Sequence, residues 1–577
     1  MSHAAQAFAR DVGIAKRHGV HYTPGSLADF LAERIVIALG EDAAVPHVLD
    51  PACGNGELLD AIGRLRPAAR LKGVDRDSQA LAEAGQRLNR EGARDFFPVH
   101  ADFLDIDPLA EASDRRLPTN AFDAIISNPP YVRTQVLGAE RAQELAERFG
   151  LSGRVDLYQA FVRAMTPCLR PGGVLGLLCS NRFLTTLGGT ALRKFLNEEY
   201  ELVEIFDLGD TKLFAAAVLP AIVIARRKCG SETGEPCSFV RVYETSVNGA
   251  ARSGVAAPRF DSIVVALAED ADGEIEANGR VYGIERGLLK MGETSKDPWT
   301  LTHDDRVAWL EQIEARTAKT FADVANIRVG IKTTADSVFI RREWDDLPTD
   351  EQPESELIYP LITHHIANRW SRHQGSKLAR TVLYPHNVKA NGKRGSVDLD
   401  NFPNARRYLE AHRERLEGRT YVIRAGRKWF EVWVAHQPVD WPKRKIVFPD
   451  ISEMPKFFLD ESGAIVNGDC YWMAFEDNVD PKLISLMLAV ANSTFAVAFY
   501  DAVCGNRLYA GRRRFITQYV NRFPIPAVDA ATLSEIHILV EKVKLTSVAS
   551  QERDELEQKL DEIIWAAFGL FVGQACI

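Results

Sequence analysis

The sequence has no long hydrophobic run. None of its apolar stretches approaches the roughly 20 consecutive residues that a membrane-spanning helix needs. Residues 1–17 also lack the apolar core of a secretion signal. These two absences argue against a membrane protein and against a secreted one, so we expect a cytoplasmic protein that works without a membrane.

Paired cysteines are missing as well. Eight cysteines are scattered along the chain without any Cys-x-x-Cys pair, a pattern that indicates neither a zinc site nor a disulfide framework. We therefore expect reduced thiols, as is typical of the cytoplasm, and no bound metal.

An excess of positive charge is also absent, since the formal net charge is −9. The distribution is uneven, however: residues 361–450 hold 18 Lys and Arg against 8 Asp and Glu, a local net charge of +10, so the rest of the chain carries −19. This asymmetry is typical of a localised phosphate-binding surface, although a solvated charged face would produce it too. The clusters that we expect to contact nucleic-acid phosphates contain Arg369, Arg372, Arg424, Lys443, Arg444, Lys445, Arg512, Arg513 and Arg514.

Short apolar runs alternate with segments of helical periodicity between residue 47 and about residue 227. The pattern predicts strands at residues 48–49, 71–74, 122–126, 174–178, 202–206 and 221–224, and helices at residues 58–65, 79–88, 156–169 and 190–198. Such alternation is typical of an α/β fold with a doubly wound, mostly parallel sheet. Ligands of these sheets bind at the carboxyl ends of the strands.

The ends of the first two predicted strands and of the next apolar stretch carry a pattern that suits a nucleoside. Asp75 ends the second strand, where nucleotide-binding folds hold ribose hydroxyls, and Asp102 with Phe103 offers a carboxylate and a ring to an adenine. Neither a Gly-x-Gly-x-x-Gly pattern nor a Gly-Lys-Ser/Thr phosphate loop is present, so the ligand needs no pyrophosphate. The first strand ends in a turn where glycine lets a ligand approach the backbone, Asp50-Pro51-Ala52-Cys53-Gly54-Asn55-Gly56.

The predicted strand 122–126 runs into an unusual pentapeptide. Its two prolines remove two backbone donors and stiffen the turn, which leaves carbonyl groups without helical partners. The asparagine and the tyrosine add an amide oxygen and a flat aromatic face, a set that suits an amino-bearing planar base. A strand-ending turn or a proline-rich ligand of a recognition domain would also fit this pentapeptide alone, which reads Ser127-Asn128-Pro129-Pro130-Tyr131.

These motifs together resemble the S-adenosylmethionine-dependent methyltransferases, and residues 13–230 are similar to the TaqI-like adenine-N6 DNA methyltransferases. The order of elements, with cofactor motifs first, the catalytic loop next and a long C-terminal remainder last, matches that class. The resemblance implies a catalytic set of Asn128, Pro129, Pro130, Tyr131 and Phe214. It implies S-adenosylmethionine binding by Tyr22, Thr23, Pro24, Asp50, Ala52, Gly54, Gly56, Asp75, Asp102, Phe103 and Asn128.

The implied reaction is methyl transfer to an adenine that has been flipped out of duplex DNA. The family roles place the base between Tyr131 and Phe214, with the Asn128 side-chain and Pro129 main-chain carbonyls accepting the amino hydrogens. Cytosine N4 presents the same hydrogens, but family loops for cytosine more often begin with Ser, so Asn128 favours adenine. RNA or a protein glutamine is a further alternative, although such enzymes are usually shorter and lack a large basic C-terminal domain.

Four segments are predicted from these patterns. Residues 1–245 should form the catalytic domain, residues 246–300 a loop-rich connection, residues 301–530 a mixed α/β target-recognition domain, and residues 531–577 a helical end. The resemblance also implies a bacterial restriction–modification system with a separate cognate endonuclease. We expect a monomer, because one catalytic domain can modify the two strands of a palindrome in turn.

Overall fold

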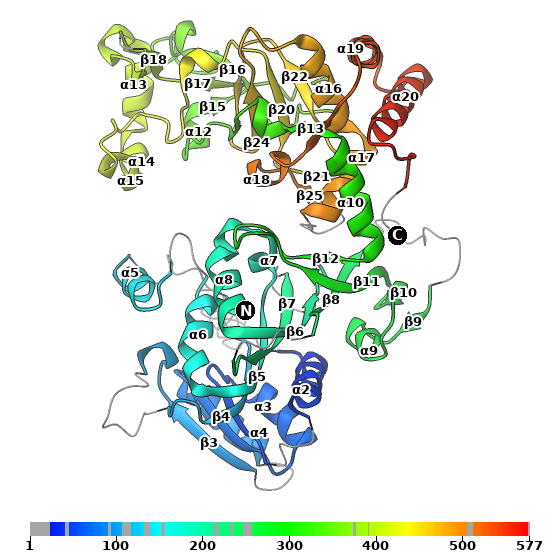
Figure 1. The fold of residues 1–577 in the computed structure, drawn as a ribbon. Coiled ribbons are helices and arrows are strands. Elements are labelled where there is room, and N and C mark those ends of the chain that lie inside the picture. The colour runs from blue at the N-terminus through cyan, green and yellow to red at the C-terminus, as the bar shows by residue number, and fades with distance from the viewer. Residues whose placement is uncertain are drawn as a thin grey trace. The chain divides into compact units, whose positions relative to one another are not determined.

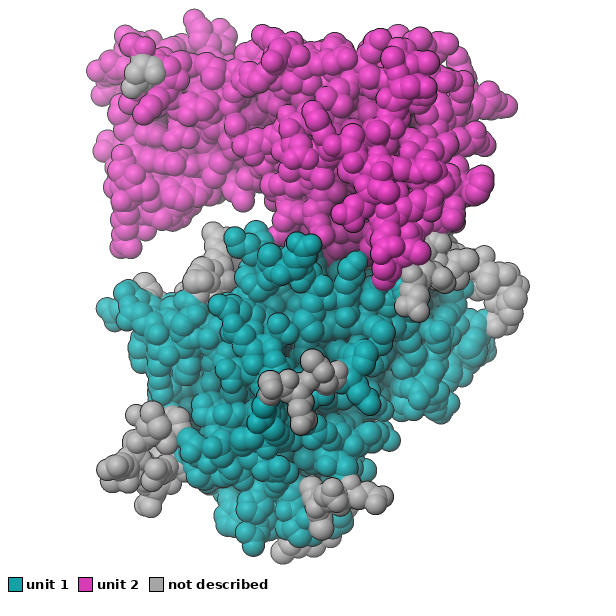
Figure 2. Space-filling view, in the orientation of Figure 1, with its two compact units in different colours: residues 1–303, 507–511 teal, residues 304–506, 512–577 magenta. Residues whose placement is uncertain are grey.

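The computed structural model describes residues 23–40, 45–89, 94–106, 117–131, 139–151, 156–211, 213, 219–230, 235–245, 257–372, 377–390, 392–504 and 512–574. The chain forms two compact units, which are coloured separately in Figure 2. Unit 1 takes residues 1–303 with 507–511, and unit 2 takes residues 304–506 with 512–577.

Unit 1 is built on one mixed sheet with the strand order β3-β2-β1-β4-β5-β7-β6-β8-β11-β10-β9, and β12 pairs with β11 (Figure 1). The five strands from β3 to β5 are parallel. Its strands are β1 (His47–Asp50), β2 (Arg70–Asp75), β3 (Asp95–His100), β4 (Phe122–Ser127), β5 (Leu169–Ser180), β6 (Tyr200–Asp207), β7 (Pro220–Arg227), β8 (Ser238–Glu244), β9 (Arg259–Phe260), β10 (Gly273–Ala277), β11 (Arg280–Lys290) and β12 (Thr300–Thr302).

Helices cover both faces of this sheet, which explains why central strands such as β4 are nearly continuous apolar runs. One face packs against α2 (Gly25–Leu39), α3 (Glu57–Leu65), α4 (Ser78–Leu88) and α9 (Ile263–Ala268), and the other against α5 (Ala139–Arg148), α6 (Tyr158–Met165) and α8 (Thr190–Glu199). The doubly wound α/β fold is therefore confirmed. The predicted strands and helices are all present, with ends that differ by a few residues.

The expected connection at residues 246–300 is wrong. Within the described part of this stretch, β9 to β12 and α9 extend the sheet of unit 1, and β11 pairs with β8 from Tyr282–Glu244 to Leu288–Ser238. Val281, Tyr282 and Ile284 are buried, so the segment is part of the domain core. The boundary between the units falls after His303.

Unit 2 is a mixed α/β domain with two four-stranded sheets, β14-β24-β20-β22 and β15-β17-β16-β23. These sheets contain β14 (Ile327–Val329), β15 (Ile340–Arg341), β16 (Ile358–Ile362), β17 (Arg380–Leu383), β20 (Lys445–Pro449), β22 (Phe458–Asp460), β23 (Ile465–Val466) and β24 (Cys470–Ala474). Short two-stranded pairs are formed by β13 (Thr317–Thr320) with β26 (Pro524–Pro526), β18 (His386–Val388) with β19 (Arg394–Ser396), and β21 (Ile451–Ser452) with β25 (Arg513–Arg514). Its longer helices are α10 (Asp304–Arg316), α13 (Pro403–Ala411), α16 (Pro481–Asn492), α17 (Thr494–Val503), α19 (Ala530–Leu545) and α20 (Gln551–Ala567).

The C-terminal helices α19 and α20 belong to the core of unit 2. Phe495 of α17 stacks on Phe568 at a centroid distance of 4.1 Å and meets Trp565 of α20 edge-on at 5.5 Å. The predicted helices are confirmed, but they do not form a separate segment. Across the described residues no single helix has the length and apolarity to cross a membrane; α16 and α17 meet that test only as a pair, and they bend by 67°.

Candidate active site

A cavity of about 310 Å³ opens at the carboxyl ends of β1, β2, β3 and β4 in unit 1. Because these strands are parallel neighbours, the residues that follow them meet at one edge of the sheet. Asp50 is the last residue of β1, Asp75 is the last residue of β2, Asp102 follows β3, and Asn128 follows β4. All four line the cavity.

The turn between β1 and α3 forms the floor of the cavity. Gly56 has φ +80°, and a Cβ there would lie 2.9 Å from the Cβ of Ala84, so a larger residue would push α4 away. The backbone N–H of Gly54 donates to Asp75 Oδ2 at 2.8 Å, and that of Cys53 donates to the Val74 carbonyl at 3.0 Å. These bonds hold the turn against the end of β2, which brings its backbone close to any ligand in the cavity.

Asp50 is a fully buried carboxyl group in the wall of this cavity. Its Oδ1 accepts a hydrogen bond from the Ala52 N–H at 3.0 Å, whereas its Oδ2 has no hydrogen-bond partner within the described residues. Burial raises the pKa of Asp50 to about 8; the Ala52 N–H opposes this shift, and the nearby charge of Asp75 adds to it. An unsatisfied buried carboxyl oxygen on a residue that lines a cavity fits a polar ligand that completes its hydrogen bonding.

The rest of the cavity suits a nucleoside. Asp75 Oδ1 accepts from the Asp77 N–H at 2.9 Å, and Asp102 Oδ1 accepts from the Leu104 N–H at 3.0 Å, so both carboxylates are fixed in orientation. The Phe103 ring stacks on Phe161 with a centroid distance of 5.8 Å and an interplanar angle of 18°. Carboxylates beside an apolar wall match the hydroxyl donors and the flat ring of an adenosine-type cofactor, so the residues present fit such a group.

The loop that follows β4, residues 128–131, closes the cavity on the side of that strand. Asn128 Nδ2 donates a hydrogen bond to Thr23 Oγ1 at 2.9 Å, which fixes the orientation of the amide. Pro129 is buried and Pro130 half-buried, so the loop is firmly packed. The Tyr131 hydroxyl is buried, and this burial raises the pKa of Tyr131 well above its usual value, so the ring stays neutral and apolar.

Most residues predicted for the site come together here. The cavity is lined by Thr23, Asp50, Ala52, Gly54, Asp75, Asp102, Phe103, Asn128, Pro129, Pro130 and Tyr131. Pro24 precedes α2 and Gly56 precedes α3, so these two support the wall without lining it. Tyr22 and Phe214 lie outside the described residues.

Sequence reasoning missed one wall of the cavity. Leu145 of α5, Leu157 just before α6 and Phe161 within α6 add an apolar surface to the cavity lining, and Arg141 of α5 also lines the cavity. The residues at 157 and 161 stand in the motif Asp156-Leu157-Tyr158-Gln159-Ala160-Phe161. Their four-residue spacing puts both side chains on one face of the helix, and this spacing was the signal available.

The chain matches two family models, an Eco57I restriction-modification methylase model over residues 70–214 and a TaqI-like C-terminal specificity domain model over residues 390–525. The type II methyltransferase M.BanIII of Aneurinibacillus aneurinilyticus is 37% identical over 96% of this chain and 97% of its own length. The chain belongs to the type II DNA methyltransferases of restriction–modification systems.

More distant similarities agree with this family. The type II methyltransferase M.PaeR7I of Pseudomonas aeruginosa is 26% identical over 91% of this chain and 88% of its own length. Among solved structures, the cryoEM structure of a DrdV–DNA complex has a TM-score of 0.52 at 11% identity and covers 92% of this chain and 57% of that chain. The latter likeness concerns the fold alone.

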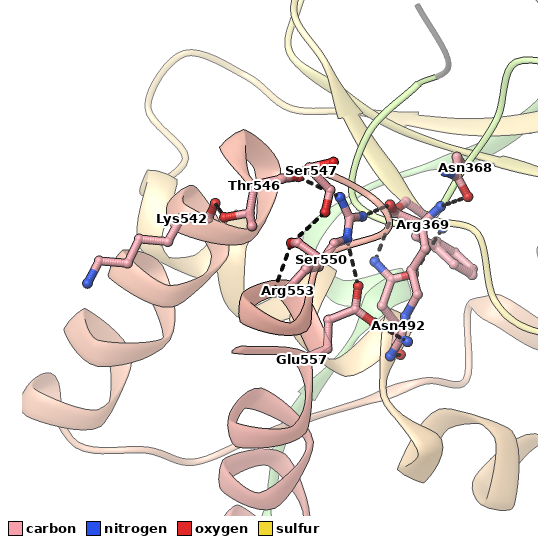
Figure 3. A network of polar contacts seen from close by, with 10 residues as sticks. Asn368, Arg369, Asn492, Lys542, Thr546, Ser547, Ser550, Arg553 and Glu557 are labelled. Carbon is pink, nitrogen blue, oxygen red and sulfur yellow. Dashed lines mark hydrogen bonds and ion pairs between the residues drawn. The ribbon is translucent and has the colours of Figure 1, made fainter. Parts of the chain in front are cut away.

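In this methyltransferase the match to a specificity domain falls in unit 2, where two of the predicted phosphate contacts are engaged in the fold instead. Arg369 makes an ion pair with Glu557 of α20 and donates to the Asn492 carbonyl, and Arg553 Nη2 donates to the Arg369 carbonyl at 2.7 Å (Figure 3). Lys445 is fully buried and pairs with Asp460 at 2.9 Å. Full burial of Lys445 contradicts the phosphate contact expected of it, and the partners of Arg369 favour a structural role for that residue.

The other seven predicted basic residues differ in how far they are engaged. Arg424 and Arg512 are exposed, and within the described part of the chain they show no hydrogen bond or ion pair. The remaining five have protein partners: Arg372 with Asp460 and Ser462, Lys443 with Glu476 and Asp440, Arg444 with the Val479 carbonyl, Arg513 with Asp501, and Arg514 with Asp450.

Proposed function

We propose that this methyltransferase transfers a methyl group from S-adenosylmethionine to the N6 amino group of an adenine in double-stranded DNA. The observation that carries the proposal is the hydrogen bond from Asn128 Nδ2 to Thr23 Oγ1 at the mouth of the cavity. Because Thr23 holds the nitrogen of the Asn128 amide, the amide oxygen points away from Thr23. This orientation suits an oxygen that accepts a hydrogen bond from the amino group of a base, and it favours that role over a purely structural turn.

The chain's own residues have distinct roles in this proposal. Asp50, Asp75 and Asp102 bind and orient the cofactor, which supplies an electrophilic methyl group when bound. The Asn128 side-chain oxygen and the Pro129 carbonyl accept the two hydrogens of the adenine amino group. These two bonds draw the nitrogen towards tetrahedral geometry and localise its lone pair, so catalysis comes from positioning and fixed dipoles.

The target base must leave the duplex to reach this edge of the sheet, at a cost of a few kcal/mol. Stacking on Tyr131 offsets part of that cost, by about 1–3 kcal/mol per base. The neutral, well-packed ring of Tyr131 suits this role. Asparagine in place of serine at the start of the loop favours adenine over cytosine, and the match to a TaqI-like specificity domain favours DNA over RNA or a protein glutamine.

Product analysis with an Asn128→Ala variant tests the proposal. DNA methylated by the wild-type protein is hydrolysed to nucleosides. Mass spectrometry of these nucleosides should then detect N6-methylated adenine. The variant should transfer no methyl group, yet bind S-adenosylmethionine with nearly unchanged affinity in calorimetry. Normal turnover by the variant would refute the role of Asn128, and N4-methylcytosine as the product would refute adenine as the target.

The matched variant Asp75→Asn separates the cofactor site from the catalytic loop. It keeps the size of the side chain but removes the charge that accepts from the Gly54 N–H, so cofactor affinity should fall markedly. Unchanged affinity would contradict the cofactor role.

We further propose that the enzyme acts as a monomer beside a separate cognate restriction endonuclease.

A further inference from the structure

Arg193 of α8 is a buried side chain that ties two loops of unit 1 together. It is 1% exposed, and it donates hydrogen bonds to the carbonyls of Phe183 and Thr186 in the loop after β5. It also donates to the Ser295 carbonyl at 3.1 Å and the Lys296 carbonyl at 3.1 Å, in the turn between β11 and β12. Leaving any of these buried hydrogen bonds unmade would cost free energy. The guanidinium therefore holds the two loops in a fixed arrangement relative to each other.

The loop after β5, which contains the short helix α7 (Arg182–Thr185) and a 3-10 turn (Leu187–Gly189), lies at the same sheet edge as the loop after β4. β4 and β5 are parallel neighbours, and Ser127 is paired with Leu177. β5 runs on past this pair to end at Ser180, and both strands end at the same edge of the sheet. Residues 181–189 thus emerge beside the pentapeptide that holds the target base in the proposed function.

Further contacts make this loop rigid. The Trp299 N–H donates to the Leu184 carbonyl at 2.7 Å, and Gln159 Nε2 donates to the Gly188 carbonyl at 3.2 Å. A Cβ at Gly189 would lie 2.2 Å from the Phe183 carbonyl oxygen, so the chain folds back on itself closely at this point. The rigid loop carries Leu187 on its outer side.

Leu187 is 58% exposed on this otherwise well-packed loop. The Arg182 and Lys296 side chains in the two tied loops are also exposed. The two tied loops therefore expose one large apolar side chain and two cations. This combination suits the surface of a duplex, where a leucine can enter between base steps while cations meet phosphates.

We propose that Leu187 is a wedge that enters the DNA duplex beside the target base and stabilises the extruded state. Arg193 is the positioning residue that holds the wedge level with the catalytic loop. This inference rests on the proposed function and deepens it, because it assigns part of base extrusion to the catalytic unit. The cost of extrusion is lower for an unpaired base, so a wedge should matter most on a fully paired target.

A Leu187→Ala variant tests the wedge on two substrates, a fully paired duplex and the same duplex with an abasic site opposite the target adenine. We expect kcat/KM to fall about 10-fold on the paired duplex and less than about 2-fold on the abasic one. Leu65→Ala is the matched control: Leu65 is 42% exposed at the end of α3, at the opposite edge of the sheet, and its loss should change neither value. An equal fall on both substrates, or no fall on the paired duplex, would overturn the wedge.

The variant Arg193→Lys tests the positioning role of Arg193. Lysine keeps the charge, but it lacks the planar guanidinium that donates hydrogen bonds to both loops at once. Like Leu187→Ala, this variant should have a reduced kcat/KM on the paired duplex and a nearly normal kcat/KM on the abasic duplex. A general loss of folding would lower kcat/KM on both duplexes alike and count against the positioning role. Failure of the proposed function looks different, because the wild-type protein would then methylate neither duplex. A wild-type protein that is active on both, with Leu187→Ala indistinguishable from it, would refute the wedge alone.

Discussion

Asn128 and Thr23 lie 105 residues apart in the sequence, and a hydrogen bond of 2.9 Å joins the amide Nδ2 of the first to the hydroxyl of the second. Thr23 precedes α2, and Asn128 follows β4. The bond therefore couples the segment before α2 to the loop to which we assign the chemistry, and it selects one orientation of the amide.

Replacing Thr23 by valine should slow methyl transfer, because valine keeps the shape of the side chain but cannot accept the hydrogen bond from Asn128. A single such bond contributes about 0.5–1.5 kcal/mol, so the single-turnover rate should fall roughly 2- to 12-fold. Thr23→Ser is the control, since it keeps the hydroxyl and should retain most of the rate. Equal rates for the valine and serine variants would show that the bond does not orient the amide.

The catalytic half of this fold was predictable because its signals are local. A buried parallel strand is a continuous apolar run, and β1, β2 and β4 each end in the polar residues that line the cavity. The sequence therefore places Asp50, Asp75 and Asn128 correctly at one edge of the sheet.

The segment at residues 246–300 does not form the expected connection because its strands depend on distant partners. β11 is stabilised by β8, and the loop from Glu293 to Pro298 is a turn held by Arg193 within unit 1. The basic residues pose the same difficulty, since Arg369 finds Glu557 across 188 positions of sequence. Local patterns do not reveal whether an arginine already has such a partner.

Cofactor binding should release a proton from Asp50 near neutral pH. Burial keeps the pKa of Asp50 at about 8, so the carboxyl group is mostly protonated at pH 7 in the free protein. A cationic cofactor in the cavity favours the ionised form and lowers that pKa, whereas Asp75, the other charge facing Asp50, opposes the change. Calorimetry at pH 7 in buffers of different ionisation enthalpy should therefore show release of a substantial fraction of one proton.

Two controls isolate Asp50 as the source of this proton. The release should vanish at about pH 9.5, where Asp50 is already ionised, and it should vanish at pH 7 in an Asp50→Asn variant. Proton release that persists undiminished in the variant would assign it to another group.

His386 should make unit 2 less stable in mild acid. Burial lowers the pKa of His386 from 6.5 to about 3, and Arg394 adds to the shift, while the bond to the Gly395 carbonyl opposes it. Its Nε2 accepts from the Val432 N–H at 3.1 Å, so the folded protein needs the neutral ring. The unfolded chain takes up a proton below pH 6.5, so this stability is complete above that pH and is lost as the pH falls towards 3.

This loss approaches about 1.4 kcal/mol for each pH unit well below pH 6.5, and it is about 1.6 kcal/mol between pH 6.5 and 5. Urea unfolding of the wild-type protein and of a His386→Gln variant at both pH values measures it. The variant should be less stable at pH 7 but lose less of its unfolding free energy on acidification. Parallel pH dependence in the two proteins would contradict the role of His386.

Arg369 and the exposed pair Arg424 and Arg512 should respond to alanine substitution in opposite ways. Arg369 contacts Glu557 of α20 and the carbonyl of Asn492 at the end of α16, as Figure 3 shows. Arg369→Ala should therefore lower the free energy of unfolding by about 2–3 kcal/mol. Once folded, that variant should bind DNA with nearly the wild-type salt dependence. Arg424→Ala and Arg512→Ala should leave stability within about 0.5 kcal/mol of the wild type, because the described residues give these side chains no partner to lose.

The contrast appears in DNA affinity plotted against salt concentration. If each exposed arginine neutralises one phosphate, its loss should reduce the slope of log K against log salt by about 1 and weaken binding to all sequences alike. Because exposure alone does not put a cation on the DNA-facing surface, an unchanged slope for either variant would exclude that residue from the contact. A reduced slope for folded Arg369→Ala would instead mean that its ion pair with Glu557 opens when DNA binds.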